Sequence, residues 1–191
     1  MAGRRAGAGL VVAVVGLTAA GCLGGGTKTV IRTQTVTSTE TVTTTGSVSS
    51  ARPCQGTDLT GVFTLIPNSA GAGQIAYALT VKNSSRSPCW VQGVPKGTLL
   101  GANGTVLPTN VKGSGGGRRI VLPPGASATA QARFSPDVAG DGDSQSGACQ
   151  PQAHTFQLTA QGVSVTEAAI RPPTSVCQRG TLNFEPFGYA G

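Results

Sequence analysis

Residues 74–82 read QIAYALTVK and decide the fold class. The larger apolar side chains of this stretch, Ile75, Tyr77, Leu79 and Val81, occupy every second position. A period of two places these side chains on one face of a β-strand, and a one-sided apolar face is typical of a strand that packs on a core. The stretch therefore predicts a strand whose other face meets solvent.

Three later stretches repeat this alternation: residues 126–134, residues 154–159 and residues 181–185. The larger side chains on their apolar faces are Phe134, Phe156, Leu158, Leu182 and Phe184. Short strands of this kind, separated by Gly, Pro and Asn and without a convincing helical period, indicate two packed sheets. We expect an all-β, two-sheet sandwich of about eight or nine short strands.

Two turns are predicted between strands. Asn103-Gly104, within residues 98–108, is the dipeptide that supplies both positive-φ positions of a type I′ hairpin turn. Residues 122–127 read LPPGAS, and this Pro-Pro-Gly sequence also predicts a tight turn.

The N-terminus has the three parts of an export signal. Arg4 and Arg5 precede 15 residues without charge, 6–20, and small residues lead to Cys22. The ending AAGC resembles a bacterial lipobox, which implies cleavage after residue 21 and attachment of lipid such as palmitate to Cys22. An uncleaved membrane anchor is the alternative, although 15 residues are short for a bilayer span. Either outcome predicts an extracytoplasmic protein at the cell membrane.

Residues 22–52 contain ten threonines and no aromatic residue. Alternating threonines from residue 33 to residue 43 do not create an apolar face, because the intervening positions mix polar and apolar types. We interpret this stretch as a disordered, Thr-rich stalk between the membrane and a folded domain at residues 53–191.

Five cysteines occur, and assigning Cys22 to lipid leaves Cys54, Cys89, Cys149 and Cys177. Oxidation is expected outside the cytoplasm. Three pairings are possible, and we favour Cys54–Cys89 with Cys149–Cys177, since each ties an early to a later part of one half of the domain. The spacings contain no C-x-x-C pair, so we do not expect a metal site.

The segments 77–108, 121–134 and 149–158, with the closing residues 181–187, resemble the domain of unknown function 4232. The resemblance covers about residues 54–187. It implies an immunoglobulin-like β-sandwich in secreted proteins and lipoproteins of high-GC Gram-positive bacteria, and it implies no catalytic or ligand-binding residues. Trp90 directly follows Cys89, whereas immunoglobulin domains place a tryptophan farther along the chain.

Charge and composition argue against several function classes. The net charge is +7, and without Arg4 and Arg5 the chain keeps 12 basic and 7 acidic residues. No run of five basic residues is present, so we do not expect nucleic acid as a partner. His154 is the single histidine, and its phase with Phe156 places it on the buried face or at its rim. We therefore expect no enzymatic activity and no cofactor.

Candidate binding residues remain. The loop GSGGGRR, residues 113–119, could present Arg118 and Arg119 to an anionic group. Trp90 offers a ring that could stack on a sugar or pack over the Cys54–Cys89 bridge. Residues 137–147 contain three aspartates, which we interpret as part of a solvated loop, with weak calcium binding as the alternative. The residues near the C-terminus, Phe187 and Tyr189, are either exposed contacts or the end of the last strand.

These observations predict a lipid-anchored envelope protein whose non-catalytic domain binds an anionic wall polymer, a glycan or another envelope protein. A hydrolase of wall material and a purely structural spacer are the alternatives. An exposed His154 beside a carboxylate would favour the hydrolase.

Overall fold

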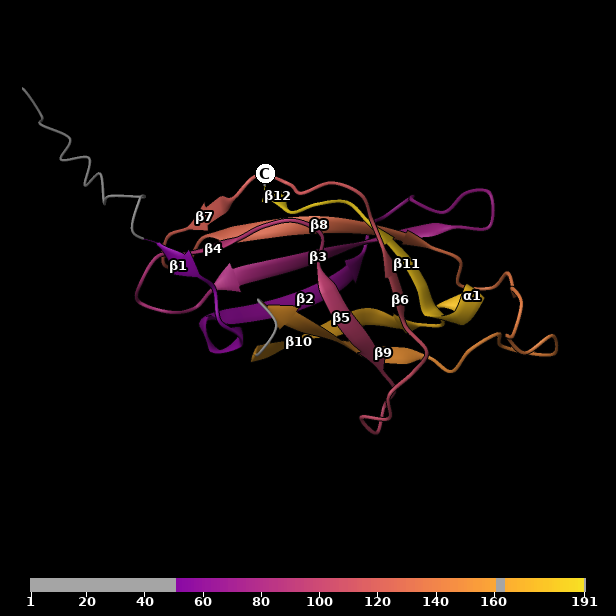
Figure 1. Ribbon diagram of the computed structural model, residues 1–191. Coiled ribbons are helices and arrows are strands. Elements are labelled where there is room, and N and C mark those ends of the chain that lie inside the picture. The colour runs from indigo at the N-terminus through magenta and orange to yellow at the C-terminus, as the bar shows by residue number, and fades with distance from the viewer. Residues whose placement is uncertain (1–50, 161–163, 191) are drawn as a thin grey trace, which may run out of the picture. The chain divides into compact units, whose positions relative to one another are not determined.

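Alternating apolar residues form strands at all four stretches where a period of two predicted them, and these strands occupy residues 75–83, 127–134, 153–160 and 181–184. The computed structural model describes residues 51–160 and 164–190 (Figure 1). Its strands are β1 (Arg52–Pro53), β2 (Leu59–Leu65), β3 (Ile75–Asn83), β4 (Cys89–Val91), β5 (Lys96–Leu100), β6 (Asn110–Lys112), β7 (Ile120–Leu122), β8 (Ser127–Phe134), β9 (Ala153–Ala160), β10 (Ser164–Thr174), β11 (Thr181–Phe184) and β12 (Gly188–Tyr189).

The described residues thus contain more strands than the eight or nine expected. Several strands are only two or three residues long, and a period of two is not detectable over so few positions. Two short helical turns, η2 (Gly56–Asp58) and α1 (Cys177–Gly180), complete the described elements. Among the described residues, no helix has the length and apolar character needed to span a membrane.

Nine strands belong to one large sheet, in the order β5-β9-β10-β2-β3-β8-β11-β6, with β12 also paired to β8. The sheet curls so that its two ends approach each other. Hydrogen bonds connect the edge strand β5 to the segment that leads into β6, the strand at the other end. The Leu107 amide donates to the Leu99 carbonyl at 2.9 Å, and the Leu99 amide donates to Thr109 Oγ1 at 2.8 Å. Figure 1 shows β5 and β6 lying near each other on one side of the domain.

The smaller sheet has the order β1-β4-β7 and supplies buried side chains to the same core. Cys89 and Val91 of β4 and Ile120 and Leu122 of β7 are buried with the inner faces of the large sheet. The two sheets therefore enclose one hydrophobic core, which makes the domain a two-sheet β-sandwich.

Aromatic rings from five strands meet at the centre of this core. Phe63 of β2 lies 5.3 Å from Tyr77, 5.8 Å from Phe156 and 5.7 Å from Phe184, measured between ring centroids. Phe134 completes the cluster at 6.5 Å from Phe63. All five rings are almost completely buried, so most of the aromatic content of the chain stabilises the fold and is not available to a ligand.

The hairpin at residues 101–105 differs from the predicted turn. Only Gly104 has a positive φ, at 72°, and Asn103 does not, so the type I′ prediction is wrong. The Gly104 amide donates to the Gly101 carbonyl, and the Gly101 amide donates to the Thr105 carbonyl. This pattern describes a three-residue loop with glycine at its left-handed position, which needs one positive φ and not two.

The turn in residues 122–127 is confirmed: Gly125 has a φ of 81°, and the Ala126 amide donates to the Pro123 carbonyl.

Asn83, at the end of β3, is completely buried and satisfies both donors and the acceptor of its side chain. Its Nδ2 donates to the carbonyls of Ser87 and Leu122, at 2.9 and 2.8 Å. Its Oδ1 accepts from the amide and the hydroxyl of Ser85, at 2.9 and 2.7 Å. Asn83 thereby fixes the loop that leads into β4 and joins it to the end of β7.

Candidate functional site

Trp90 and Arg119, two of the three residues predicted to bind a ligand, lie together on the smaller sheet. Trp90 of β4 pairs with Val121 of β7, and Arg119 directly precedes β7. The guanidinium carbon of Arg119 lies 4.2 Å from the centroid of the Trp90 ring. This is the geometry of a cation–π contact.

Arg118, the third predicted residue, makes a similar contact with a different ring. Its guanidinium carbon lies 5.4 Å from the ring centroid of Tyr189, which belongs to β12 and is 57% exposed. The sequence left the role of the C-terminal aromatic residues open. The structure separates them, because Phe187 is buried in the core while Tyr189 reaches the surface.

We call the residues Trp90, Arg118, Arg119 and Tyr189 the arginine–aromatic surface. Neither guanidinium group forms a salt bridge or a hydrogen bond with another described residue, and the single salt bridge among the described residues joins Arg52 to Asp58. The contact with the ring does not use up the N–H donors of either guanidinium group, and no other described residue accepts from them. The surface can therefore offer charge-assisted hydrogen bonds to phosphate or carboxylate groups.

Two glycines of the loop before these arginines, Gly113 and Gly117, lie too close to their neighbours to accept a side chain. A Cβ atom at Gly113 would come within 2.5 Å of the Phe184 carbonyl oxygen. A Cβ atom at Gly117 would lie 3.0 Å from the Gly93 amide nitrogen, and φ at Gly117 is 50°. Gln92 Nε2 also donates to the Gly117 carbonyl at 3.1 Å. These contacts determine where Arg118 and Arg119 leave the loop.

A small pocket adjoins the same strand. It has a volume of about 40 Å³, and the residues around it are Cys54, Leu59, Trp90, Val91, Gln92, Pro95, Leu158, Thr159 and Phe187. Trp90 and Cys54 thus border one pocket. The lining is apolar apart from Gln92 and Thr159, and it carries no charge.

Both favoured disulfides, Cys54–Cys89 and Cys149–Cys177, are present. The first links the residue after β1 to β4, and the Cys54 amide donates to the Trp90 carbonyl at 2.9 Å. The Arg52 guanidinium makes two hydrogen bonds to the Asp58 carboxylate, at 2.7 and 2.9 Å. These bonds, with that from the Gln55 amide, hold the pKa of Asp58 below its usual range.

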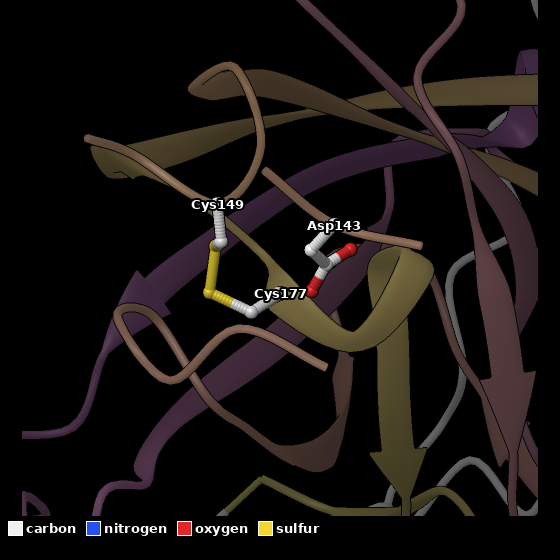
Figure 2. Close-up of side chains that lie close together, drawn as sticks. All are labelled: Asp143, Cys149 and Cys177. Atoms are coloured by element: carbon white, nitrogen blue, oxygen red, sulfur yellow. A yellow bond between two sulfur atoms is a disulfide. The ribbon is translucent and has the colours of Figure 1, made fainter. Parts of the chain in front are cut away.

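The second disulfide lies beside Asp143 (Figure 2), and here the sequence interpretation is wrong in part. Asp137 and Asp141 are exposed as expected, but Asp143 is buried and not solvated. Its carboxylate accepts hydrogen bonds from Gln150 Nε2 at 2.6 Å and from the Gly140 amide at 2.9 Å.

The Asp143 carboxylate also accepts from two amides of α1, those of Gln178 and Arg179. Gln178 and Arg179 both have a φ of 56°, a left-handed conformation that is costly for residues other than glycine. The amides of these two successive residues both donate to the one Asp143 carboxylate, which holds them in this conformation. The hydrogen bonds, above all that from the Gly140 amide, lower the pKa of Asp143 markedly.

Asp143 and the two sulfur atoms lie within 4.8 Å of one another, as the ligands of a metal would. However, the sulfurs of Cys149 and Cys177 are bonded to each other, and the carboxylate already accepts four hydrogen bonds. We therefore interpret the cluster as structural. Nothing in the sequence distinguished Asp143 from Asp137 and Asp141, because burial here depends on contacts with residues 35 or more positions away.

His154, which its phase with Phe156 predicted to lie on the buried face or at its rim, is half-buried. It lines a shallow hollow beside the 101–105 hairpin, together with Asn103, Pro151 and Gln152 among others. None of the residues that line this hollow has a carboxylate.

Cys22, the predicted lipid attachment site, lies outside the described residues, as do the signal and nearly all of the stalk.

Comparison with known proteins identifies the domain. Residues 54–188 match the family described as "Domain of unknown function (DUF4232)", a range that includes both disulfides and nearly all of the strands. No curated protein and no solved structure matches the chain. Since the match covers most of the sequence, the chain belongs to the domain of unknown function 4232 family.

Proposed function

We propose that the chain is a lipid-anchored protein of the cell envelope whose β-sandwich binds an anionic envelope polymer without catalysing a reaction. The observation that carries the proposal is the arginine–aromatic surface. Two adjacent arginines lie over two different rings and have no acidic partner among the described residues. Two guanidinium groups without an internal acidic partner can bind a polymer that carries repeated phosphate or carboxylate groups.

The arrangement lowers the cost of binding in two ways. Contact with a ring restricts each arginine before the ligand arrives, so that less side-chain entropy is lost on binding. The absence of a competing carboxylate means that no internal ion pair has to break. Retention should therefore depend on charge and should fall as salt screens the interaction.

The test is retention of the purified domain on insoluble wall glycan at low and high salt. We expect the double variant Arg118→Ala/Arg119→Ala to reduce the affinity at least tenfold at low salt, because each charge-assisted hydrogen bond contributes about 1.5–3 kcal/mol. The matched control is Arg133→Ala/Arg171→Ala, which removes the same charge from two exposed arginines on β8 and β10. Equal retention of the two double variants would contradict the proposal, since it would show that net charge alone matters.

The anchoring part of the proposal is supported by the sequence of residues 1–22. Labelling of cells with palmitate should mark the protein at the membrane, whereas Cys22→Ser should be unlabelled. An unlabelled parent protein that is free in the medium would contradict the lipid anchor.

A further inference from the structure

The pocket beside Trp90 is the most informative feature that the proposed function does not use. Trp90 and Gln92 border the pocket and also contact the loop that carries the two arginines: Arg119 lies over the Trp90 ring, and Gln92 donates to Gly117. Arg119 and the pocket therefore share Trp90 as a neighbour, and we take the pocket as the place for the adjacent group of a ligand held by Arg119.

The lining defines what the pocket can accept. Seven of its nine residues are apolar, and the two polar ones, Gln92 and Thr159, are uncharged. Cys54 offers no thiol, because its sulfur is bonded to Cys89. An uncharged group with an apolar end and a few polar atoms matches this lining, since burial of a charge without a partner would be strongly unfavourable.

The volume sets a limit on size. A single water needs on the order of 10–15 Å³ of such space, so about 40 Å³ holds a group of only a few non-hydrogen atoms. A lipid acyl chain is much too large. An acetamido group, with its methyl end and its one amide, has a suitable size and polarity.

Two arginines on separate rings add a second requirement. Arg118 and Arg119 are adjacent in sequence but lie over Tyr189 and Trp90, so they present two separate cationic positions. A polymer with regularly repeated acidic groups can engage both positions, whereas a single carboxylate at the end of a peptide can engage only one. The combined chemistry favours a glycan over a peptide.

We propose that the pocket bordered by Trp90, Gln92 and Thr159 accepts the N-acetyl group of an amino sugar within an acidic glycan. This inference rests on the proposed function and specifies the class of polymer. The acidic groups engage Arg118 and Arg119, and the acetyl methyl enters the pocket. No covalent step is involved.

The first test uses the unmodified protein and soluble probes of known composition. Hyaluronan oligosaccharides carry both acetamido and carboxylate groups, and polygalacturonate oligosaccharides carry carboxylates alone. We expect hyaluronan to bind roughly tenfold more tightly, a discrimination typical of one small group in an apolar pocket. Hyaluronan that has been de-N-acetylated and then re-acylated with butyryl groups keeps its charge but has a larger substituent, and we expect it to lose this advantage.

The second test enlarges a residue that borders the pocket. Thr159→Leu should remove the preference for the N-acetylated probe and leave binding of polygalacturonate unchanged. Thr155→Leu is the matched control, because Thr155 is also a half-buried threonine of β9, lies on the same face of the strand, and is not part of the pocket. Circular dichroism and thermal unfolding verify that both variants fold. If Thr159→Leu does not fold, the butyryl probe still tests the pocket in the unmodified protein.

The outcomes separate this inference from the proposed function. Equal binding of hyaluronan, its butyryl form and polygalacturonate would overturn the inference and leave the anionic-polymer proposal intact. Displacement of the polymer by a short peptide with a free carboxylate, but not by hyaluronan, would overturn it in favour of a peptide ligand. Absence of binding to every polyanion, wall glycan included, would overturn both.

Discussion

Asn83 is the residue whose burial best shows how polar side chains organise this domain. Its carboxamide makes four hydrogen bonds and connects β3, the loop before β4 and the end of β7. The sequence contained a signal for this burial, because Asn83 continues the phase of Tyr77, Leu79 and Val81. An asparagine in such a position has to be fully hydrogen-bonded.

Replacement of Asn83 tests this role. Asn83→Ala should lower the free energy of unfolding by about 2–3 kcal/mol, because the buried Leu122 carbonyl loses its donor and the loop before β4 loses its acceptor. Urea denaturation with intact disulfides measures the change. Asn183→Ala is the control, since Asn183 is exposed and its side chain donates one long hydrogen bond to Arg133; its effect should stay within about 0.5 kcal/mol. Similar losses for the two variants would contradict the assigned role.

Asp143 makes the free energy of unfolding depend on pH in the acidic range. Because its pKa is lowered in the folded state, its contribution is complete above the pKa of an unfolded aspartate, about 3.9, and decreases as pH falls from there toward the folded pKa. Asp58, whose pKa is also lowered, acts in the same direction. The domain should therefore lose stability progressively below about pH 4.

Asp143→Asn should remove part of this acid dependence. It should also destabilise the domain at pH 7 by about 2–3 kcal/mol, because the neutral amide accepts hydrogen bonds from the Gln178 and Arg179 amides less strongly and directs a donor toward one of them. Thermal unfolding at pH 3 and pH 7 measures both effects. An unchanged difference in stability between the two pH values would show that Asp143 does not titrate as described.

At the scale of elements, the two disulfides have different relations to the arginine–aromatic surface. Cys54–Cys89 holds β4, the strand of Trp90, whereas Cys149–Cys177 holds the loop around Asp143. Their sequence separations of 35 and 28 residues predict similar contributions to stability, about 3.5–4 kcal/mol each in the chain-entropy treatment.

Removal of either disulfide by paired Cys→Ser substitution should therefore lower the unfolding temperature by a similar amount. The two removals should differ in their effect on retention by wall glycan. Loss of Cys54–Cys89 should weaken retention on wall glycan, because β1 and β4 lose their covalent connection and Trp90 its fixed position. Loss of Cys149–Cys177 should leave retention of the folded fraction unchanged. If removal of Cys149–Cys177 weakened retention as strongly, the binding surface would extend to the other end of the domain.

The sequence could predict four of the strands, and strand length does not explain which ones. The 11-residue β10 and the seven-residue β2 were not singled out, whereas the four-residue β11 was. Strands β3, β8, β9 and β11 showed a clear period of two, since one face of each contacts the core. The strands of the smaller sheet are only two or three residues long, which is too short for a period of two to be recognised. The 101–105 hairpin has a three-residue loop, because the strand pairing ends at Leu100 and Val106 and the Gly101 amide bonds to the Thr105 carbonyl. The Asn-Gly dipeptide alone does not determine this loop length.

At the scale of the whole molecule, the candidate site combines residues that the sequence singled out with one that it could not place. Arg118, Arg119 and Trp90 were predicted from residue type and context, and the structure brings each arginine to an aromatic ring. Tyr189 joins them because β12 pairs with β8, a contact between segments about 60 residues apart. Such long-range pairing has no local signature in the sequence, and the same is true of the pocket beside Trp90.

In the proposed protein the five cysteines serve two purposes, lipid attachment at one and disulfide formation at four. Intact mass spectrometry of the mature protein from its native membrane tests this division most directly. We predict a chain that begins at Cys22, carries the added mass of acyl chains, and lacks four hydrogens relative to the fully reduced polypeptide. A mature chain with an unmodified Cys22, or with free thiols at Cys54, Cys89, Cys149 or Cys177, would contradict the account.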